Sequence, residues 1–263
     1  NRGPTLEVTL AKLRRLNPRA QVIALSATVG NAVEVADWLD AHCVVSEWRP
    51  VELREGVLYG AAIHFADDSD RELEDMGREA AVSLALNTVA EGGQCLLFAG
   101  TRRNAEGLAQ RTARALRELL DDESRERLYG LSMQTRGESE TESGRKLADC
   151  LRGGAAFHHA GLLGEHRRLV ENAFRSGDVK VVAATPTLAA GLNLPARRVV
   201  IRDWQRYEAN QGNVPIPVLE YKQMAGRAGR PGLDPYGESV LIAKGDEELE
   251  ELMNFYVLAD VEP

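Results

Sequence analysis

The chain has 263 residues, 44% hydrophobic and 27% charged, so a globular core is expected and global disorder is excluded. No apolar run approaches the roughly 20 residues that a membrane-spanning helix needs, and three distant cysteines argue against a disulfide framework or a zinc ribbon. The net charge of −8 is concentrated at residues 245–263, which hold seven acidic residues and no Lys or Arg, whereas residues 197–230 are locally basic. A local basic stripe is what a phosphate backbone would meet. We therefore expect a cytoplasmic protein with no membrane partner.

The first fifty residues predict two helices and a strand. Leucines at helical spacing predict a helix over residues 4–15. The apolar run 21–25 predicts a buried strand. Asn31 and Glu34 have the spacing of a capping box, which opens a helix that reaches Asp40.

From residue 51 onward, predicted strands and helices alternate. The strands are expected at 51–59, 94–98, 155–157, 179–184, 199–202 and 239–243. The helices are expected in a segment ending at Glu91 and at 101–120, 165–175 and 219–228. The polar stretch 121–143 is the least structured by composition, although short helices fit there. This alternation indicates an α/β fold with a mostly parallel sheet and helices on both faces.

Glycine-containing or polar segments follow three of the predicted strands. These segments are 100–102, 158–161 and 185–187, with Gly191 just beyond the last. Open parallel sheets bind ligands beyond the carboxyl ends of their strands. Each segment alone fits a turn or a helix cap, but together they favour a ligand surface along one edge.

The strongest local signal is the segment 223–230, Gln-Met-Ala-Gly-Arg-Ala-Gly-Arg. If it is helical, Gln223, Arg227 and Arg230 share one face. Its two glycines would weaken a helix by about 1 kcal/mol each, which indicates that the backbone approaches another group closely. Arginine suits a phosphate because its planar fork donates two parallel hydrogen bonds. The alternative is a surface helix with solvated arginines.

Taken together, these segments resemble the motor core of superfamily 2 helicases. In the family's order, the matching segments are 26–28 (motif III), 97–102 (motif IV), 157–161 (motif IVa), 184–196 (motif V) and 223–230 (motif VI). The histidine pair 158–159 and the segments 191–195 and 229–232 are most similar to archaeal fork-repair DNA helicases of the superkiller-like group, related to human HELQ and to the helicase domain of DNA polymerase theta. RNA-exosome helicases of that group have a second arginine where Pro231 stands, which favours DNA over RNA.

The resemblance implies the C-terminal motor half of an ATP-dependent 3′–5′ DNA helicase that unwinds duplex DNA at stalled replication forks. In such helicases ATP and Mg²⁺ lie between two RecA-like domains, and the first domain supplies the phosphate loop and the acidic box. The sequence contains no Gly-x-x-x-x-Gly-Lys-Ser/Thr loop. We therefore expect ATP and Mg²⁺ to be held mainly by a missing first domain, and this fragment alone to be inactive.

The family's element order also implies a division into three parts. Residues 1–48 would be the C-terminal remnant of the first RecA-like domain, and residues 49–245 the second RecA-like helicase domain. Residues 246–263 would be an acidic linker toward a missing winged-helix domain. The expected partners are single-stranded and forked DNA and those two domains of the same protein, which is expected to be a monomer.

Roles for individual residues follow from the same resemblance. Arg227 and Arg230 would be arginine fingers at the β- and γ-phosphates, with Gln223 in support. The residues expected to couple ATP to movement are Ser26, Thr28, Gly191 and Asn193. The residues expected to contact the phosphates of the translocating strand are Thr101, Arg102, His159, Thr185 and Thr187.

Residues 203–218 predict a β-hairpin, because turn residues lie between aromatic and aliphatic flanks. Pro215 and Pro217 restrict its second strand to an edge. In the resembling family a hairpin at this place separates the duplex, and its candidate residues here are Trp204, Arg206, Tyr207 and Asn210. For Trp204, packing under a surface loop is an equal alternative.

The sequence also offers three other interpretations. The residues His158, His159 and His166 could suggest a metal, but adjacent histidines at a strand end point in opposite directions and no Cys or carboxylate completes the set, so no metal is expected. An RNA helicase of the same group is the same-fold alternative. A non-catalytic RecA-like module that binds nucleic acid is the alternative from another class.

Overall fold

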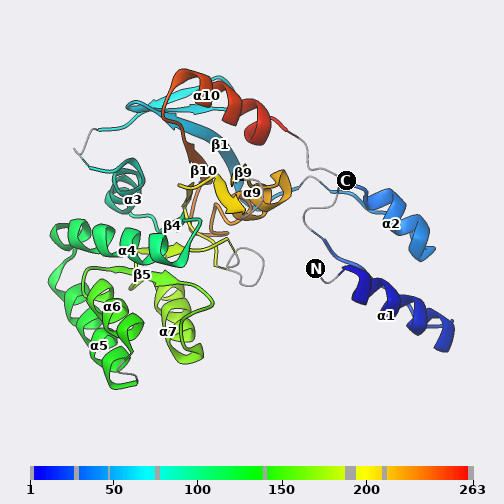
Figure 1. Ribbon diagram of the computed structural model, residues 1–263, viewed down its shortest axis with the longest axis horizontal. Coiled ribbons are helices and arrows are strands. Elements are labelled where there is room, and N and C mark those ends of the chain that lie inside the picture. Colours follow the sequence, from blue (N-terminus) through cyan, green and yellow to red (C-terminus); the bar gives the residue numbers. More distant parts are fainter. Residues whose placement is uncertain are drawn as a thin grey trace. The chain divides into compact units, whose positions relative to one another are not determined.

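The computed structural model describes residues 3–26, 30–46, 48–74, 78–138, 141–186, 194–208 and 212–259 (Figure 1). Its contacts divide the chain into two compact units, Asn1–Glu47 with Glu262–Pro263 and Trp48–Val261. The predicted residues Thr28, Thr187, Gly191, Asn193 and Asn210 lie outside the described residues.

The smaller unit contains the two predicted helices, α1 (Gly3–Leu16) and α2 (Ala32–Leu39). Asn31 does not cap the backbone of α2, and its Nδ2 instead donates to Glu34 Oε2 at 3.1 Å. The buried strand predicted at 21–25 is wrong, because residues 21–26 form no strand and Leu25 is exposed. A strand is stabilised by neighbours in a sheet, and the described part of this unit supplies none.

The larger unit is built on one eight-stranded sheet. Its strands are β1 (Glu52–Tyr59), β2 (Ala62–Phe65), β3 (Asp70–Glu72), β4 (Cys95–Phe98), β5 (Ala155–His158), β6 (Val181–Ala184), β7 (Arg198–Ile201) and β10 (Tyr236–Ile242). They are ordered β3-β2-β1-β10-β7-β4-β6-β5. The pairings β1–β10, β10–β7, β7–β4, β4–β6 and β6–β5 are all parallel. The predicted mostly parallel α/β sheet is therefore confirmed. The antiparallel strands β2 and β3 escaped prediction because they are short and partly exposed.

Helices cover both faces of this sheet. They are α3 (Ala80–Ala90), α4 (Arg102–Leu116), α5 (Asp122–Glu138), α6 (Glu142–Leu151), α7 (Gly164–Arg175), α9 (Val218–Ala225) and α10 (Asp246–Leu252). Helix α3 packs beside α4. Helices α4 and α7 lie on opposite faces, since the adjacent residues His158 and His159 contact Glu171 of α7 and Glu106 of α4. None of the described helices is long and apolar enough to cross a membrane.

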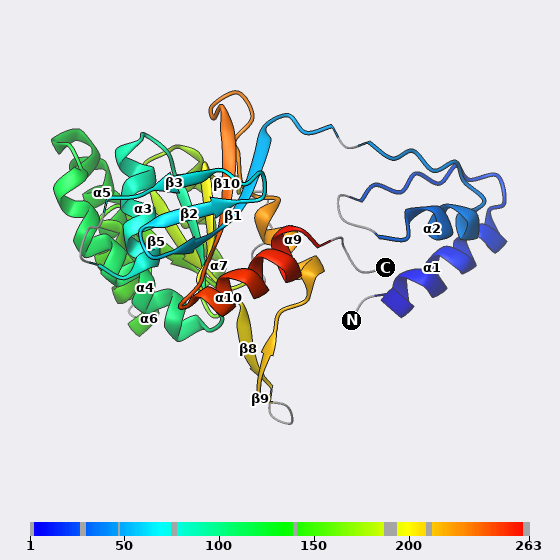
Figure 2. The same ribbon diagram turned by 90° about the horizontal axis from the view of Figure 1, so that it is seen from above.

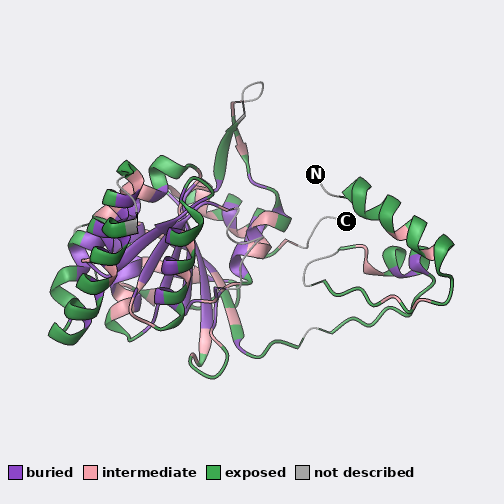
Figure 3. Cartoon of the chain, turned by 90° about the horizontal axis from the view of Figure 1, so that it is seen from below, coloured by how far each residue is buried: buried purple, intermediate pink, exposed green. Residues whose placement is uncertain are grey.

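The centre of the sheet is the core of the molecule (Figure 3). All residues of β4, β5, β6 and β7 are buried. These strands read as continuous apolar runs because helices cover them on both sides. Each large apolar side chain removed from water contributes about 1.5–3 kcal/mol.

Helix α5 lies within the polar stretch 121–143, whose composition predicted the least structure. Its residues Leu128, Ser132 and Thr135 are buried at helical spacing, and the helix packs on α6. Two of these three residues carry hydroxyl groups, so an apolar pattern does not reveal the buried face.

The segment expected to be a linker is folded as far as residue 259. Residues 246–252 form α10, and Met253–Val257 form a π-helical turn, η2. Leu252, Tyr256 and Val257 are buried in the main core. This differs from the expected linker. The acidic residues lie mainly on the exposed side of α10, whereas apolar residues of α10 and η2 pack on the core.

Candidate nucleic-acid and nucleotide surfaces

The carboxyl ends of four parallel strands lie side by side. In sheet order these strands are β7, β4, β6 and β5. Strand β7 is followed by Arg202, β4 by residues 99–101, β6 by Thr185 and β5 by His159. Backbone bonds tie these ends together, since Arg202 N donates to Phe98 O and Ala99 N donates to Ala184 O. As predicted, the strand-end segments share one edge, called here the carboxyl edge.

The start of α4 is arranged around Asp203 at the carboxyl edge. Thr101 caps the helix, because its Oγ1 accepts from Asn104 N at 3.1 Å. Asp203 Oδ2 accepts from Gly100 N at 2.9 Å and from Asn104 Nδ2 at 3.2 Å. Arg102 is exposed on the first turn. The neighbouring Arg103 is exposed as well, so two arginines face solvent at this helix start.

The two adjacent histidines bond to opposite faces of the sheet. His158 Nε2 lies 3.0 Å from Glu171 on α7, and His159 Nε2 lies 3.2 Å from Glu106 on α4. His159 Nδ1 accepts from Gly161 N at 3.1 Å, so its Nε2 carries the proton toward Glu106. The side chain of His159 is only 3% exposed. The buried ring therefore holds the loop 159–161 in place and does not face solvent.

Burial also sets the charge of this histidine pair. It lowers the pKa of both rings, against the opposing effect of Glu171 on His158 and of Glu106 on His159. The neutral form is therefore favoured. In the part of the chain that the structure describes, no group of three or more His, Cys, Asp or Glu side chains could hold a metal ion.

A cavity of about 480 Å³ opens beside the carboxyl edge. It brings together three of the predicted residues, Thr185, Arg206 and Gln223, which come from three different elements. The remaining lining residues are Gly100, Pro186, Asp203, Gln205, Ile216, Pro217, Leu219 and Glu220. The cavity thus joins the strand ends, the start of the hairpin and helix α9.

The predicted hairpin is present as β8 (Gln205–Glu208) paired antiparallel with β9 (Gly212–Pro215). Figure 2 shows it extending away from the main sheet. Tyr207 is 76% exposed, and Arg206 Nη1 lies 3.0 Å from Glu220 Oε2. Trp204 is only 8% exposed and donates from Nε1 to Glu248 Oε1 at 3.0 Å. The structure therefore favours the packing role for Trp204 and leaves Tyr207 as the exposed aromatic residue.

The segment 223–230 is not helical throughout. Helix α9 ends at Ala225, and Gly229 has φ +91°. A Cβ at Gly229 would lie 2.6 Å from Val51 Cγ1, so only glycine fits this close approach. The prediction that Gln223, Arg227 and Arg230 share one helical face is therefore wrong, because the chain leaves the helix before Arg230.

The turn after α9 lies at the opposite, amino edge of the sheet. Ala196, just before β7, donates from its N to Arg227 O at 2.9 Å and accepts from Gly229 N at 2.6 Å. Arg227 is half-buried, and burial lowers the pKa of its guanidinium group. Arg227 thus does not extend from the carboxyl edge.

Arg230 is held in an internal ion pair at the same amino edge. Its Nε and Nη2 lie 2.8 and 2.7 Å from the two carboxylate oxygens of Asp234, and Nη1 donates to Gln94 Oε1 at 2.7 Å. Arg230 is 15% and Asp234 4% exposed. Because Gln94 directly precedes β4, Arg230 lies at the edge opposite to Thr101 and Thr185. Asp234 stands four residues after Arg230 in the sequence, but the sequence does not show that the two side chains form an ion pair.

A buried charge network next to this turn escaped sequence analysis. Glu238, 1% exposed, accepts from Arg198 Nε at 2.7 Å and also pairs with Arg71 and Arg197. Burial alone would raise the pKa of Glu238, but Arg198 and the other two arginines lower it overall. Arg71, Arg197 and Arg198 lie at least 40 residues from Glu238 in the sequence, so no local pattern predicts the network.

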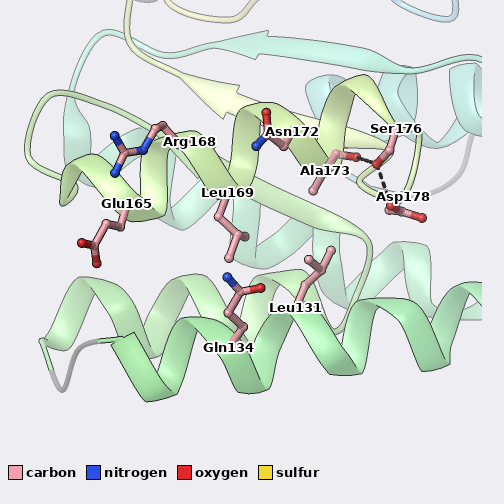
Figure 4. A pocket seen from close by; sticks show the side chains of 9 residues that line it. All are labelled: Leu131, Gln134, Glu165, Arg168, Leu169, Asn172, Ala173, Ser176 and Asp178. Atoms are coloured by element: carbon pink, nitrogen blue, oxygen red, sulfur yellow. Dashed lines mark hydrogen bonds between the residues drawn. The ribbon is translucent and has the colours of Figure 1, made fainter.

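A second cavity, of about 430 Å³, lies between α5 and α7 (Figure 4). Its walls are mixed, with Leu131 and Leu169 beside polar side chains. Ser176 Oγ, at one end, donates to Asp178 Oδ2 at 2.6 Å. None of the predicted site residues lines this cavity.

Comparison with known proteins agrees with this architecture. A family described as the helicase conserved C-terminal domain matches residues 111–232. The match and the parallel sheet with helices on both faces agree with a RecA-like helicase C-terminal domain.

Within that class, the chain matches archaeal Hel308. It is 58% identical over 262 residues to the ATP-dependent DNA helicase Hel308 of Methanocella arvoryzae, covering 100% of this chain and 35% of that protein. Identity to the Hel308 of Pyrobaculum calidifontis is 52% over 261 residues, covering 99% and 37%. Identity to that of Caldivirga maquilingensis is 44% over 265 residues, covering 97% and 34%. The predicted resemblance is confirmed, and the chain spans about a third of the length of these relatives.

Proposed function

We propose that this chain is the C-terminal motor half of an ATP-dependent 3′–5′ DNA helicase that unwinds duplex DNA at stalled replication forks. The observation that carries the proposal is the separation of two surfaces on one RecA-like sheet, a polar carboxyl edge and an arginine-bearing amino edge. The relatives' description as ATP-dependent DNA helicases supports it. The whole protein would be a cytoplasmic monomer.

The carboxyl edge would bind single-stranded and forked DNA. Thr101, Arg102, Thr185 and Thr187 would contact phosphates, and His159 would hold the loop 159–161 in place. The exposure of Arg102 and the adjoining cavity support this assignment. Phosphate contacts make binding sensitive to salt and largely independent of base sequence.

The amino edge would face ATP held by a first RecA-like domain, of which residues 1–48 would be the C-terminal part. Arg227 suits this role because its half-buried guanidinium group lies in a turn of small residues. ATP hydrolysis would supply the free energy for strand separation, and Arg227 would stabilise negative charge on the phosphates, an effect worth about 10³–10⁵ in rate for arginine fingers. Gln223, which lines the cavity beside the carboxyl edge, would support Arg227 through the end of α9 and the turn after it. Ser26, Thr28, Gly191 and Asn193 would couple ATP to movement.

Mg²⁺ would be held mainly by the first RecA-like domain, since this ion is usually bound by one or two carboxylates together with the phosphates of the nucleotide. Residues 49–245 would form the second motor domain, with residues 246–257 packed on its core, and the chain beyond them would lead toward a winged-helix domain.

The hairpin β8–β9 would separate the strands of the duplex. Exposed Tyr207 could stack on a base at the fork, which contributes about 1–3 kcal/mol. Arg206 and Asn210 would lie near the displaced strand.

ATP hydrolysis measured with and without DNA tests the proposal. The full-length protein should hydrolyse ATP faster with single-stranded DNA, and the 263-residue chain alone should show no hydrolysis. Full activity in the chain alone would contradict the division of the ATP site. RNA that stimulates as well as DNA would favour an RNA helicase, and no hydrolysis by the full-length protein would favour a non-catalytic module.

A deletion tests the hairpin. Removal of residues 210–213 should slow unwinding of forked DNA much more than it slows ATP hydrolysis. Unchanged unwinding would remove strand separation from the role of this element.

A further inference from the structure

The hairpin depends on contacts at its base. Its two strands form a sheet of their own and do not pair with the eight-stranded sheet. An isolated two-stranded hairpin is marginally stable in water. Something else must therefore fix the direction in which it extends, and Figure 3 shows the chain becoming buried where the hairpin joins the body.

The base of the hairpin is closed by Trp204, just before β8, and Ile216, just after β9. Ile216 N donates to Trp204 O at 2.9 Å. Both side chains are buried. This pair is the last hydrogen-bonded step between the two strands before the chain enters the body.

A buried tyrosine from the C-terminal segment binds both of these carbonyl groups. Tyr256 Oη donates to Ile216 O at 2.8 Å and lies 3.3 Å from Trp204 O. Its ring also packs edge-on against the Trp204 indole, with 6.4 Å between centroids. One hydroxyl group thus bridges the two strands at their root.

The same segment holds Trp204 from a second side. Glu248 Oε1 accepts from the Trp204 indole Nε1 at 3.0 Å, and its Oε2 accepts from Lys244 N at 2.6 Å. The carboxylate is therefore fixed by the backbone at the start of α10. Together, α10 and η2 contact the hairpin root through two separate polar groups.

The segment also contacts helix α9, which carries Gln223. Lys222 Nζ donates to Val257 O at 3.1 Å and pairs with Glu55 on β1 at 3.2 Å. The ring of Tyr256 packs on Tyr221 of α9, with 5.2 Å between centroids. Tyr256 thus contacts both α9 and the root of the hairpin.

We propose that residues 246–257 form a clamp that holds the strand-separating hairpin in its working direction, with Tyr256 and Glu248 as positioning residues. The proposal rests on the proposed role of the hairpin and adds a residue-level account of what orients it. Neither residue would touch DNA or ATP. The loss of either contact would loosen the hairpin and leave the ATP site intact.

The test is Tyr256→Phe in the full-length helicase, with Tyr221→Phe as the matched control. Each substitution removes one buried tyrosine hydroxyl, but that of Tyr221 makes no hydrogen bond to the described residues of the hairpin. Amide hydrogen exchange in residues 204–217 should become about fivefold faster in Tyr256→Phe, the factor expected for one net hydrogen bond. It should stay unchanged in Tyr221→Phe. Trp204→Phe, which removes the donor to Glu248, should act in the same direction as Tyr256→Phe.

Unwinding and ATP hydrolysis complete the test. Tyr256→Phe should slow the unwinding of forked DNA with little change in DNA-stimulated ATP hydrolysis, and it should add no further loss when residues 210–213 are deleted. Equal exchange in Tyr256→Phe and wild type, or an increase spread over the whole domain, would overturn the clamp. If the deletion alone leaves unwinding unchanged, the strand-separating role fails instead, while the exchange measurement still decides whether the clamp positions the hairpin.

Discussion

The two edges of the sheet use the same residue type in opposite ways. At the carboxyl edge, Arg102 is exposed on the first turn of α4 beside a cavity. At the amino edge, Arg230 is locked to Asp234 and Gln94. The four residues of β4 separate these edges by about 13 Å, at about 3.3 Å per residue. Its pairing with the buried carboxylate of Asp234, and not its residue type, thus makes Arg230 less available to a ligand than Arg102.

The largest expected effect concerns Arg227. Arg227→Ala in the full-length helicase should lower kcat for DNA-stimulated ATP hydrolysis by about 10³ or more, because developing phosphate charge loses its partner. Affinity for single-stranded DNA, measured by fluorescence anisotropy, should be retained. Arg227→Lys should not restore the rate, since an ammonium group lacks the bidentate geometry. Equal loss of hydrolysis and DNA affinity would contradict a division between the two edges.

Arg230 should instead affect stability. Arg230→Ala leaves the buried carboxylate of Asp234 unpaired, which should lower the free energy of unfolding by about 3–5 kcal/mol. Chemical denaturation measures this, with Arg54→Ala as the control. Arg54 pairs with Glu52 on the exposed surface, and that substitution should cost about 0–1 kcal/mol. Wild-type stability with lost hydrolysis would make Arg230 an arginine finger after all.

A smaller effect is expected on DNA binding from the carboxyl edge. Arg102→Gln should weaken single-stranded DNA binding and reduce the slope of log K against log salt by about 1, the loss of one phosphate contact. Titrations at several salt concentrations measure the slope. Arg54→Gln, at the amino edge, should leave the slope unchanged, and the reverse pattern would exchange the roles of the edges.

The smallest effect is a difference in acid sensitivity. The pKa values of His158 and His159 are lowered below their usual 6.5, mainly by burial, so their contribution to stability is present above pH 6.5 and is lost as the pH falls through the lowered values. The pKa of Glu238 is lowered from 4.5, so its contribution is present above pH 4.5 and is lost only in stronger acid. As the pH falls, the stabilising contribution of the carboxyl edge should therefore be lost before that of the Glu238 network. Thermal midpoints should fall less between pH 7 and 5.5 in His159→Gln than in wild type, whereas Glu238→Gln should not change that slope.

The sequence predicted those features that depend on local pattern. Strands β4 and β6 are apolar because helices cover both faces, and the hairpin follows from turn residues between its flanks. Helix α5 escaped because Ser132 and Thr135 occupy its buried face.

The arrangement of motif VI could not be predicted from spacing. Its glycines allow a sharp turn, and only the packing of Gly229 against Val51 shows where that turn lies. Helical spacing therefore gave a false shared face for Arg230. The clamp on the hairpin was hidden for a similar reason, since Tyr256 and Trp204 are 52 residues apart.

The central claim is that DNA and ATP meet opposite edges of one sheet. Hydrogen exchange in the full-length helicase, with single-stranded DNA or with a non-hydrolysable ATP analogue, tests it most directly. DNA should protect amides in residues 100–104 and 159–161, whereas the analogue should protect residues 226–230. Protection of the same edge by both ligands, or of residues 226–230 by DNA alone, would contradict the account.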